Sequence, residues 1–462
     1  MDTCTSSSEP GLTRVRGTLS KTWRQANVSA GFTLATVGDL VLDSALSSRL
    51  ETRSPGLLAL LRAGDVTFGN FETTALDLAA FDGWPEAQPG GSWLISAPEV
   101  PADLRRMGFD MVSRANNHAA DWGVAGMRST DKLLTEAGLV HAGTGDTLTA
   151  ARAPRQLTVS AGRVALVAAA STFQEMSRAA DPSGQVPGRP GVNALRTERS
   201  IIVSEEQLAV LADVRNGRPT AGAPGPHGAV TLGGSRFVAA SHTDLGHSGL
   251  TYTLHADDRD AVLRNIRQAK QASDFAIFSL HTHEPGNGFS YPPAFMLELA
   301  RAAVDNGADA VVGHGPHRLR GIEIYRGRPL FYSLGNFFFT ANTQHPLPAE
   351  AWARAAADPR MITEAELLEH KRATGTFADR LWYESVVAVS RFDQSGELIT
   401  IELHPIELHW DGPRDADRGI PRLAGPEGGN RVLEELRELS RPYGTEIRIL
   451  DGIGVITARP AD

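Results

Sequence analysis

Short apolar runs alternate with amphipathic segments along the chain from residue 32 onward. Runs such as FTLATVGDLVL, RVALVAAAS and DFAIFSLHTH are apolar without interruption, as is typical of strands buried on both faces. The segments between such runs, including SPGLLALLRAG, VAGMRSTDKLLTEAG and YPPAFMLELARAAVDNGA, have apolar residues at helical spacing. Strands that alternate with helices predict an α/β fold with a largely parallel sheet covered on both faces.

Four regions follow from this pattern. We predict a polar, poorly ordered lead-in over residues 1–30 and a metal-binding catalytic domain over 31–340. Residues 341–380 are rich in Ala and Glu and predict a helical insertion or lid. Residues 381–462 predict a hairpin, an amphipathic helix and a strand that pack on the main domain. Within the main domain, residues 216–235 are dense in Gly and Pro and predict a long irregular loop.

Composition narrows the class of protein. The net charge of −9 argues against binding to nucleic acid or to an anionic membrane, since both partners attract basic surfaces. No run approaches the roughly 18 apolar residues of a membrane span, and the N-terminus has no apolar core of a signal peptide, so we expect a cytoplasmic protein. Cys4 is the only cysteine, which excludes an intramolecular disulfide and a cysteine-based zinc site.

Polar residues that suit metal chemistry follow the apolar runs. Such positions lie at the carboxyl ends of the predicted strands, where the loops of a layered α/β fold converge on one crevice. Carboxylate, amide and imidazole groups together suit hard or borderline divalent metals. The candidates are Asp39, Glu72, Asn117, His118, Asp121, His281, His283, His314 and His317.

The histidines differ in what their local sequence indicates. His314 and His317 lie three residues apart on a Gly/Pro-bent loop, which allows both imidazoles to point into one cavity. In RANNHAADWG, Asn117 can offer an amide oxygen to a cation, while Asp121 can orient the His118 imidazole for proton transfer. The alternative is that these three residues cap the following helix. In SLHTHEP, alternation places both histidines on one side of an extended chain, where one can be a ligand and the other a proton carrier.

Six ordered motifs, GDLVLD, GNFE, RANNHAAD, SLHTHE, GHGPH and YSLGNF, resemble the CapA-type family, named for capsule poly-γ-glutamate synthesis. That family belongs to the calcineurin-like metallophosphoesterase superfold. The resemblance implies a four-layer α/β/β/α sandwich with a metal centre at the strand ends. It places metal ligands at Asp39, Glu72, Asn117, His281 and His314. It also implies an acid/base role for His118 and makes His317 a second ligand or a proton carrier.

The chain departs from the pattern of two-metal phosphoesterases at three positions. Val41 stands where those enzymes have the histidine of an Asp-x-His motif, and Glu72 with Asn70 replaces their bridging aspartate. The family usually has His-Trp-Gly where this chain has His281-Thr282-His283. These changes favour a hard ion such as Ca²⁺ or Mn²⁺, one or two per chain, without an organic cofactor.

Three functions remain open from the sequence. The first is a peptide epimerase, similar to the lasso-peptide epimerases of the family, that inverts a Cα of a ribosomal precursor peptide with His118–Asp121 and with His283 or His317 as its two bases. The second is a metal-dependent hydrolase, either a phosphoesterase acting on a small anionic substrate or an enzyme processing poly-γ-glutamate amides. The third is a binding protein that kept the fold and lost catalysis.

Overall fold

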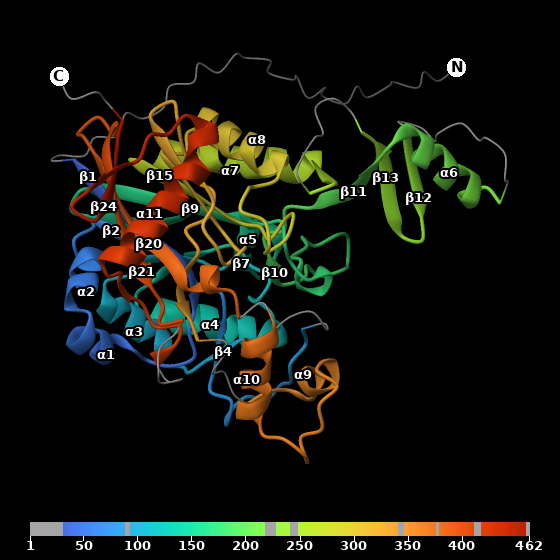
Figure 1. The fold of residues 1–462 in the computed structure, drawn as a ribbon, viewed down its shortest axis with the longest axis horizontal. Helices are drawn as coiled ribbons and strands as arrows, with labels where there is room; N and C mark the ends of the chain where they lie inside the picture. The colour runs from blue at the N-terminus through green and yellow to red at the C-terminus, as the bar shows by residue number, and fades with distance from the viewer. Residues whose placement is uncertain are drawn as a thin grey trace, which may run out of the picture.

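The computed structural model describes residues 31–87, 93–217, 228–240, 248–340, 346–375, 378–410 and 417–458. The predicted lead-in over 1–30, including Cys4, lies outside these residues. Two large sheets stack face to face between layers of helices (Figure 1). The predicted four-layer α/β/β/α sandwich is therefore confirmed.

The larger sheet has ten strands, and β1 lies at its centre. Strands β2, β5, β6 and β19 extend from β1 in parallel, whereas β20, β21, β22, β23 and β24 are antiparallel additions. The strands are β1 (Phe32–Val41), β2 (Val66–Asn70), β5 (Met111–Ser113), β6 (Val140–Ala142), β19 (Asn336–Phe339), β20 (Glu384–Phe392), β21 (Leu398–Glu407), β22 (Arg422–Leu423), β23 (Arg448–Leu450) and β24 (Ile453–Thr457).

The second sheet has six strands in the order β17-β18-β16-β15-β9-β8. Its central pairs are parallel, and the hairpins β17–β18 and β8–β9 make its edges antiparallel. The strands are β8 (Arg155–Val159), β9 (Gly162–Ala170), β15 (Phe275–His281), β16 (Ala310–His314), β17 (Ile322–Tyr325) and β18 (Arg328–Phe331). The prediction of largely parallel sheets thus holds for β1, β2, β5, β6 and β19 and for the centre of the second sheet. The strands β20–β24 and the edge hairpins of the second sheet run antiparallel.

Apolar clusters fill the spaces between the layers. One lies between the two sheets and includes Phe68, Leu166 and Ile277. The outer face of the larger sheet packs against α1 (Ser47–Arg53), α2 (Pro55–Arg62), α3 (Val100–Met107) and α4 (Gly123–Glu136). The outer face of the second sheet packs against α7 (Ala256–Ala272) and α8 (Ala294–Asp305), and α11 (Pro426–Ser440) packs against β21.

A small unit projects from one side of the sandwich (Figure 1). Its four-stranded sheet, ordered β12-β13-β11-β14, packs on helix α6. Its elements are β11 (Thr197–Val203), α6 (Glu205–Arg215), β12 (Ala229–Leu232), β13 (Ser235–Ala239) and β14 (Leu250–Leu254). The prediction of an irregular loop over 216–235 is wrong where β12 begins, because the glycines of Leu232-Gly233-Gly234-Ser235 form the tight turn of a β12–β13 hairpin.

The remaining segments occupy the periphery. Residues 346–375 contain α9 (Ala349–Arg354) and α10 (Glu364–Thr374), and the proposed closing of residues 341–380 over the site stays a prediction. Other short elements are β3 (Thr74–Ala75), β4 (Ile95–Ser96), β7 (Thr144–Gly145), α5 (Leu148–Arg152) and β10 (Gly191–Val192). Of the helices in the described ranges, none has the length and apolar character that crossing a membrane requires.

Candidate metal centre

The carboxyl ends of the central strands bring the predicted residues together. Parallel pairing places Asp39 of β1 opposite Asn70 of β2 on one side and opposite Asn336 of β19 on the other. In the facing sheet, His281 of β15 pairs with His314 of β16. A close approach of Gly38 and Gly335 allows this convergence, because a Cβ on Gly38 would lie 1.8 Å from the Gly335 carbonyl oxygen.

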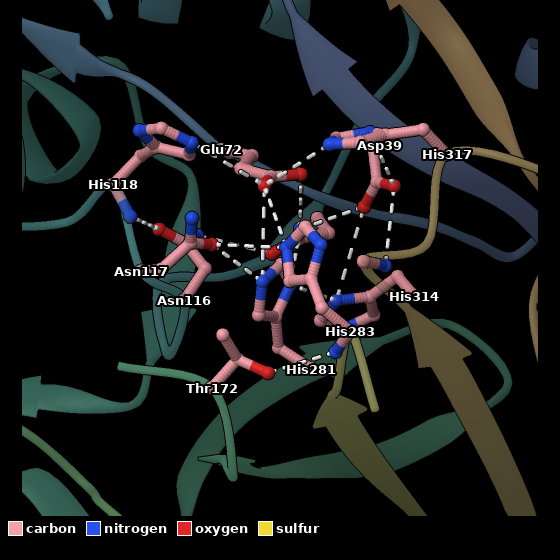
Figure 2. Close-up of polar contacts among 12 residues, drawn as sticks. Asp39, Glu72, Asn116, Asn117, His118, Thr172, His281, His283, His314 and His317 are labelled. Carbon is pink, nitrogen blue, oxygen red and sulfur yellow. Dashed lines mark hydrogen bonds and ion pairs between the residues drawn. The ribbon is translucent and has the colours of Figure 1, made fainter. Parts of the chain in front are cut away.

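Glu72 lies in the middle of this group with an unsatisfied carboxylate oxygen. Its side chain is fully buried, and Oε1 has no hydrogen-bond partner. Imidazole nitrogens surround that oxygen on several sides (Figure 2). The Nε2 atoms lie 3.7 Å away for His281 and His283, and 3.9 Å away for His118 and His317. A buried acceptor without a donor is costly in a protein interior, and a cation is the partner that suits it.

Three overlapping groups of donor atoms are close enough to hold an ion. Within each group the donor atoms lie within 4.8 Å of one another. The groups are Asp39–His281–His314, Glu72–His281–His283 and Asp39–Glu72–His317. Carboxylate oxygen and imidazole nitrogen are a donor set for divalent first-row metals, so the residues present fit a divalent metal ion.

The electrostatics of the two carboxylates also favour a cation. Burial would raise the pKa of Asp39, but a hydrogen bond and charge interaction with His317, together with His314 and Asn70, lower it to about 2. Burial, and then the Asp39 charge, raise the pKa of Glu72 well above its ordinary value. Two buried carboxylates this close are both ionised only when positive charge lies between them.

Two of the imidazoles near these carboxylates, those of His281 and His314, are held in their neutral form. Burial lowers the pKa of His314 to about 4 despite the Asp39 charge. Burial and the neighbouring histidines lower the pKa of His281 well below its ordinary value. Neutral imidazole is the form that binds metals, so these side chains are prepared for coordination before any ion arrives.

His118 and Asp121 form a dyad beside the donor groups. The His118 Nδ1–H donates to Asp121 Oδ2 at 2.7 Å, which leaves Nε2 facing Glu72. Burial would lower the pKa of His118, but Asp121 and then Glu72 raise it above its ordinary value. Asp121 also accepts hydrogen bonds from the Leu94 amide and from Gln174. The predicted orientation of His118 by Asp121 is therefore present.

His283 and His317 have partners of their own. His283 Nδ1 lies 2.6 Å from Asn287 Oδ1, and its side chain is 17% exposed, so it is partly in contact with solvent. His317 Nδ1 lies 2.9 Å from Asn336 Oδ1, and its ring packs against Trp382. His317 has a φ of 57°, a left-handed conformation that is strained for a residue with a Cβ. Both side chains belong to the donor groups above, so each is a candidate ligand.

Asn117 contacts the histidines and is not in direct contact with either carboxylate. Its Oδ1 lies 2.6 Å from His281 Nε2 and 3.3 Å from His283 Nε2. Val41, the residue at the position of the missing motif histidine, is buried in the apolar cluster between the larger sheet and its helices. The first strand therefore contributes one candidate ligand, Asp39.

Asn70 was named from the sequence only as part of the replacement for a bridging aspartate, and Asn336 was not singled out, although both asparagines hold side chains of the site. Asn70 Nδ2 donates to Asp39 Oδ1 at 2.8 Å and to Glu72 Oε2 at 3.4 Å, and Asn336 orients His317. Both asparagines belong to the same triplet, Gly-Asn-Phe, at 69–71 and 335–337. Repetition of a Gly-Asn pair beside two predicted strand ends was the signal that could have identified them.

The fold and this cluster define a four-layer α/β protein with a candidate metal centre between the carboxyl edges of its two sheets. Residues 33–341 match the family described as bacterial capsule synthesis protein PGA_cap, and the chain belongs to that family. The predicted relationship to CapA-type proteins is thereby confirmed.

Several relatives place the chain within this family. The protein named y4uA of Sinorhizobium fredii is 45% identical over 443 residues, which are 93% of this chain and 94% of the relative. The PGA biosynthesis protein CapA of Bacillus subtilis is 25% identical over 75% of this chain and 74% of its own. A probable polyglutamine synthesis accessory protein of Mycobacterium tuberculosis, Rv0574c, is 28% identical over 59% of this chain and 55% of its own.

Proposed function

We propose that this protein is a metal-dependent hydrolase that cleaves an amide bond in a glutamate-containing polymer or peptide. The observation that carries the proposal is the unsatisfied Glu72 Oε1, which is fully buried among imidazole nitrogens at 3.7–3.9 Å. Relatives named for PGA biosynthesis and for polyglutamine synthesis support an amide-linked substrate. The family relationship therefore favours hydrolysis over the epimerase that the sequence also indicated.

The residues present suggest how the reaction is divided among them. Asp39, Glu72, His281 and His314 would hold the ion, with His283 or His317 completing its coordination. When bound, a divalent cation supplies Lewis-acid chemistry by withdrawing electron density from an oxygen of the substrate.

His118 would carry the proton. Its Nε2 faces the donor groups, and Asp121 fixes Nδ1 as the protonated nitrogen. A raised pKa keeps a proton available at Nε2 near neutral pH, so His118 can donate to the departing amine. Asp121 holds the ring in that orientation and stabilises its charged form, as the carboxylate of a histidine dyad does.

One specific observation keeps peptide epimerisation as a second candidate. His118 and His317 lie on different sides of Glu72 in Figure 2, and each Nε2 is 3.9 Å from Glu72 Oε1. Inversion of a Cα needs one base to remove the proton and an acid on the other face to return one. Two imidazoles that approach the same carboxylate oxygen from different sides would supply one such group on each face.

Isotope labelling tests both reactions in one experiment. The manganese-loaded protein is incubated with γ-linked glutamate oligomers, α-linked peptides or an aryl phosphate in a mixture of H₂¹⁸O and D₂O, and products are analysed by mass spectrometry. We expect one ¹⁸O in a newly formed carboxylate and no deuterium on carbon. Deuterium at Cα without chain cleavage would establish the epimerase in its place, and ¹⁸O in phosphate would establish a phosphoesterase.

Metal content provides an independent test of the centre. Elemental analysis of purified protein is expected to give one or two divalent ions per chain, and Asp39→Asn is expected to remove them. A control substitution at Asp257, in the first turn of α7, is expected to leave the metal content unchanged. Wild-type protein that binds no ion after dialysis against Mn²⁺ or Ca²⁺ would refute the proposal.

A further inference from the structure

A buried arginine that contacts no substrate-facing atom links the two loops that carry Glu72 and His118. Arg114 follows β5, and its side chain is fully buried. Its Nη1 donates to the Phe71 carbonyl at 3.0 Å and to the Thr73 carbonyl at 2.6 Å, the two residues that flank Glu72. Its Nη2 donates to the Ala119 carbonyl, directly after His118, at 3.3 Å. One guanidinium therefore holds the main chain beside both functional groups.

Arg114 differs from the arginine of an ordinary buried ion pair. Three of its hydrogen bonds go to main-chain carbonyls, and the nearest carboxylate, Asp131 of α4, lies 3.5 Å from Nε. Burial lowers the pKa of Arg114, and Asp131 offsets part of this effect. A charged group that is removed from water and paired this loosely costs free energy, so a neutral apolar residue would stabilise the core more simply. The guanidinium offers five N–H donors in one fixed plane, and no other side chain can hold several carbonyls in this way.

Glu72 is the residue that most needs such support. Because Oε1 accepts no hydrogen bond, no side-chain contact at that atom fixes its distance to the imidazoles. The Phe71 carbonyl also accepts from Asn116 Nδ2 at 2.9 Å, so the main chain before Glu72 is held twice. With the Thr73 carbonyl held as well, the main chain is fixed on both sides of Glu72.

From these contacts we infer that Arg114, anchored by Asp131, is a positioning residue that sets the spacing between Glu72 and His118 through the main chain. The inference rests on the proposed metal centre. It makes Arg114 a determinant of metal affinity although it is not a ligand. Outer contacts that orient metal ligands typically contribute 10–100-fold to affinity, which sets the scale of the expected effect.

Manganese titration followed by EPR tests the inference without a substrate. In Arg114→Lys the charge remains, but a single ammonium replaces the fork, so the three carbonyls are no longer held together. We expect Mn²⁺ binding about 10–100-fold weaker than in the wild type, with an altered spectrum of the bound ion. The matched control is Arg152→Lys, since Arg152 is also largely buried but donates to Asn193 and Asp258, away from the centre. It is expected to bind Mn²⁺ like the wild type.

A second variant covers the case in which Arg114→Lys does not fold. Asp131 is 21% exposed on the surface of α4, so Asp131→Asn is expected to fold while it loosens Nε of Arg114. We expect Mn²⁺ affinity several-fold below that of the wild type, with unfolding temperatures recorded for every variant. If a variant folds and shows the Mn²⁺ affinity and EPR spectrum of the wild type, the positioning role of Arg114 is overturned. Failure of the wild type itself to bind Mn²⁺ would instead refute the metal centre.

Discussion

Two buried groups of acidic residues in this protein are neutralised in different ways. At the candidate metal centre, Asp39 and Glu72 are fully buried, and the bases that face them from the described parts of the chain are imidazoles. At the start of β20, Glu384 is 2% exposed, and arginines accompany it: Oε1 accepts from Arg431 at 2.6 Å and from Arg380 at 3.0 Å. We refer to Glu384, Glu407, Arg380, Arg422 and Arg431 as the arginine–glutamate cluster; with other residues it lines a cavity of about 280 Å³.

The difference shows what each group needs in order to fold with its carboxylates charged. Guanidinium carries a permanent positive charge, so the arginine–glutamate cluster is neutralised by the chain itself. Imidazole that is buried prefers to be neutral, and burial lowers the pKa of both His281 and His314. The metal centre therefore has negative charge and neutral donors, which is the composition of a site completed by a cation.

The largest expected effect comes from removing one charge at the centre. Glu72→Gln keeps the shape but removes the ionisable carboxylate, and we expect Mn²⁺ affinity and turnover to fall at least about 100-fold, since substitutions outside the ligand shell already cost 10–100-fold. Isothermal titration with Mn²⁺ and the labelled-water assay measure the two quantities.

Glu72→Gln should lower Mn²⁺ affinity but raise the stability of the metal-free protein. The folded-state pKa of Glu72 is raised, so the group stabilises the metal-free protein below its ordinary pKa and loses that contribution as pH rises through the folded value. Metal-free Glu72→Gln should therefore unfold at a higher temperature than the metal-free wild type at pH 7. A lower unfolding temperature would contradict the view that an uncompensated charge is buried here.

A smaller effect, confined to turnover, is expected for His118→Asn. The amide can still accept or donate near Glu72 but cannot carry a proton at neutral pH, so we expect turnover to fall about 10²–10⁴-fold. Metal content should remain that of the wild type, because His118 belongs to none of the three donor groups. Loss of the ion together with activity would reassign His118 as a ligand.

Removing a carboxylate from the arginine–glutamate cluster should affect stability but not metal binding, in contrast to Glu72→Gln. Glu384→Gln should leave Mn²⁺ affinity and turnover unchanged, because neither quantity depends on that cluster. The lost charge-assisted hydrogen bonds should lower the free energy of unfolding by about 1–3 kcal/mol, measured by urea denaturation. We expect this small loss in the free energy of unfolding because Arg431 and Arg380 are 33% and 46% exposed, so both side chains can be solvated by water.

The smallest expected effect is the contribution of a single histidine, His314, to the pH dependence of stability. His314 has a folded-state pKa of about 4, below its ordinary value of about 6.5. The unfolded chain therefore binds more protons between these values, and the stability of the metal-free protein falls as pH drops from about 6.5 to 4. In His314→Asn this slope should decrease, as urea denaturation at pH 7, 6 and 5 would show. An unchanged slope would remove His314 from the titrating groups.

The sequence predicted where the site residues lie along the chain, but not which residues are their hydrogen-bond partners. Asp39, His281 and His314 each follow an apolar run, and the carboxyl ends of parallel strands meet at one edge, so their convergence was expected. The roles of Asn70 and Asn336 were not predicted, because they depend on contacts with Asp39, Glu72 and His317 that only the folded chain makes. The β11–β14 unit was missed in part because its strands are short and half-exposed, so they lack a strong apolar pattern.

The sequence by itself determined the local elements, the strand ends at which polar residues occur and the chemical type of the donors, because periodicity and residue type are local properties. Tertiary structure alone decided which strand ends are neighbours, which carboxylate oxygen stays without a partner and which imidazoles become neutral. Those properties depend on distances between segments remote in the chain and on the water excluded when two sheets pack together. The charge balance of Glu72 is therefore a property of the folded protein.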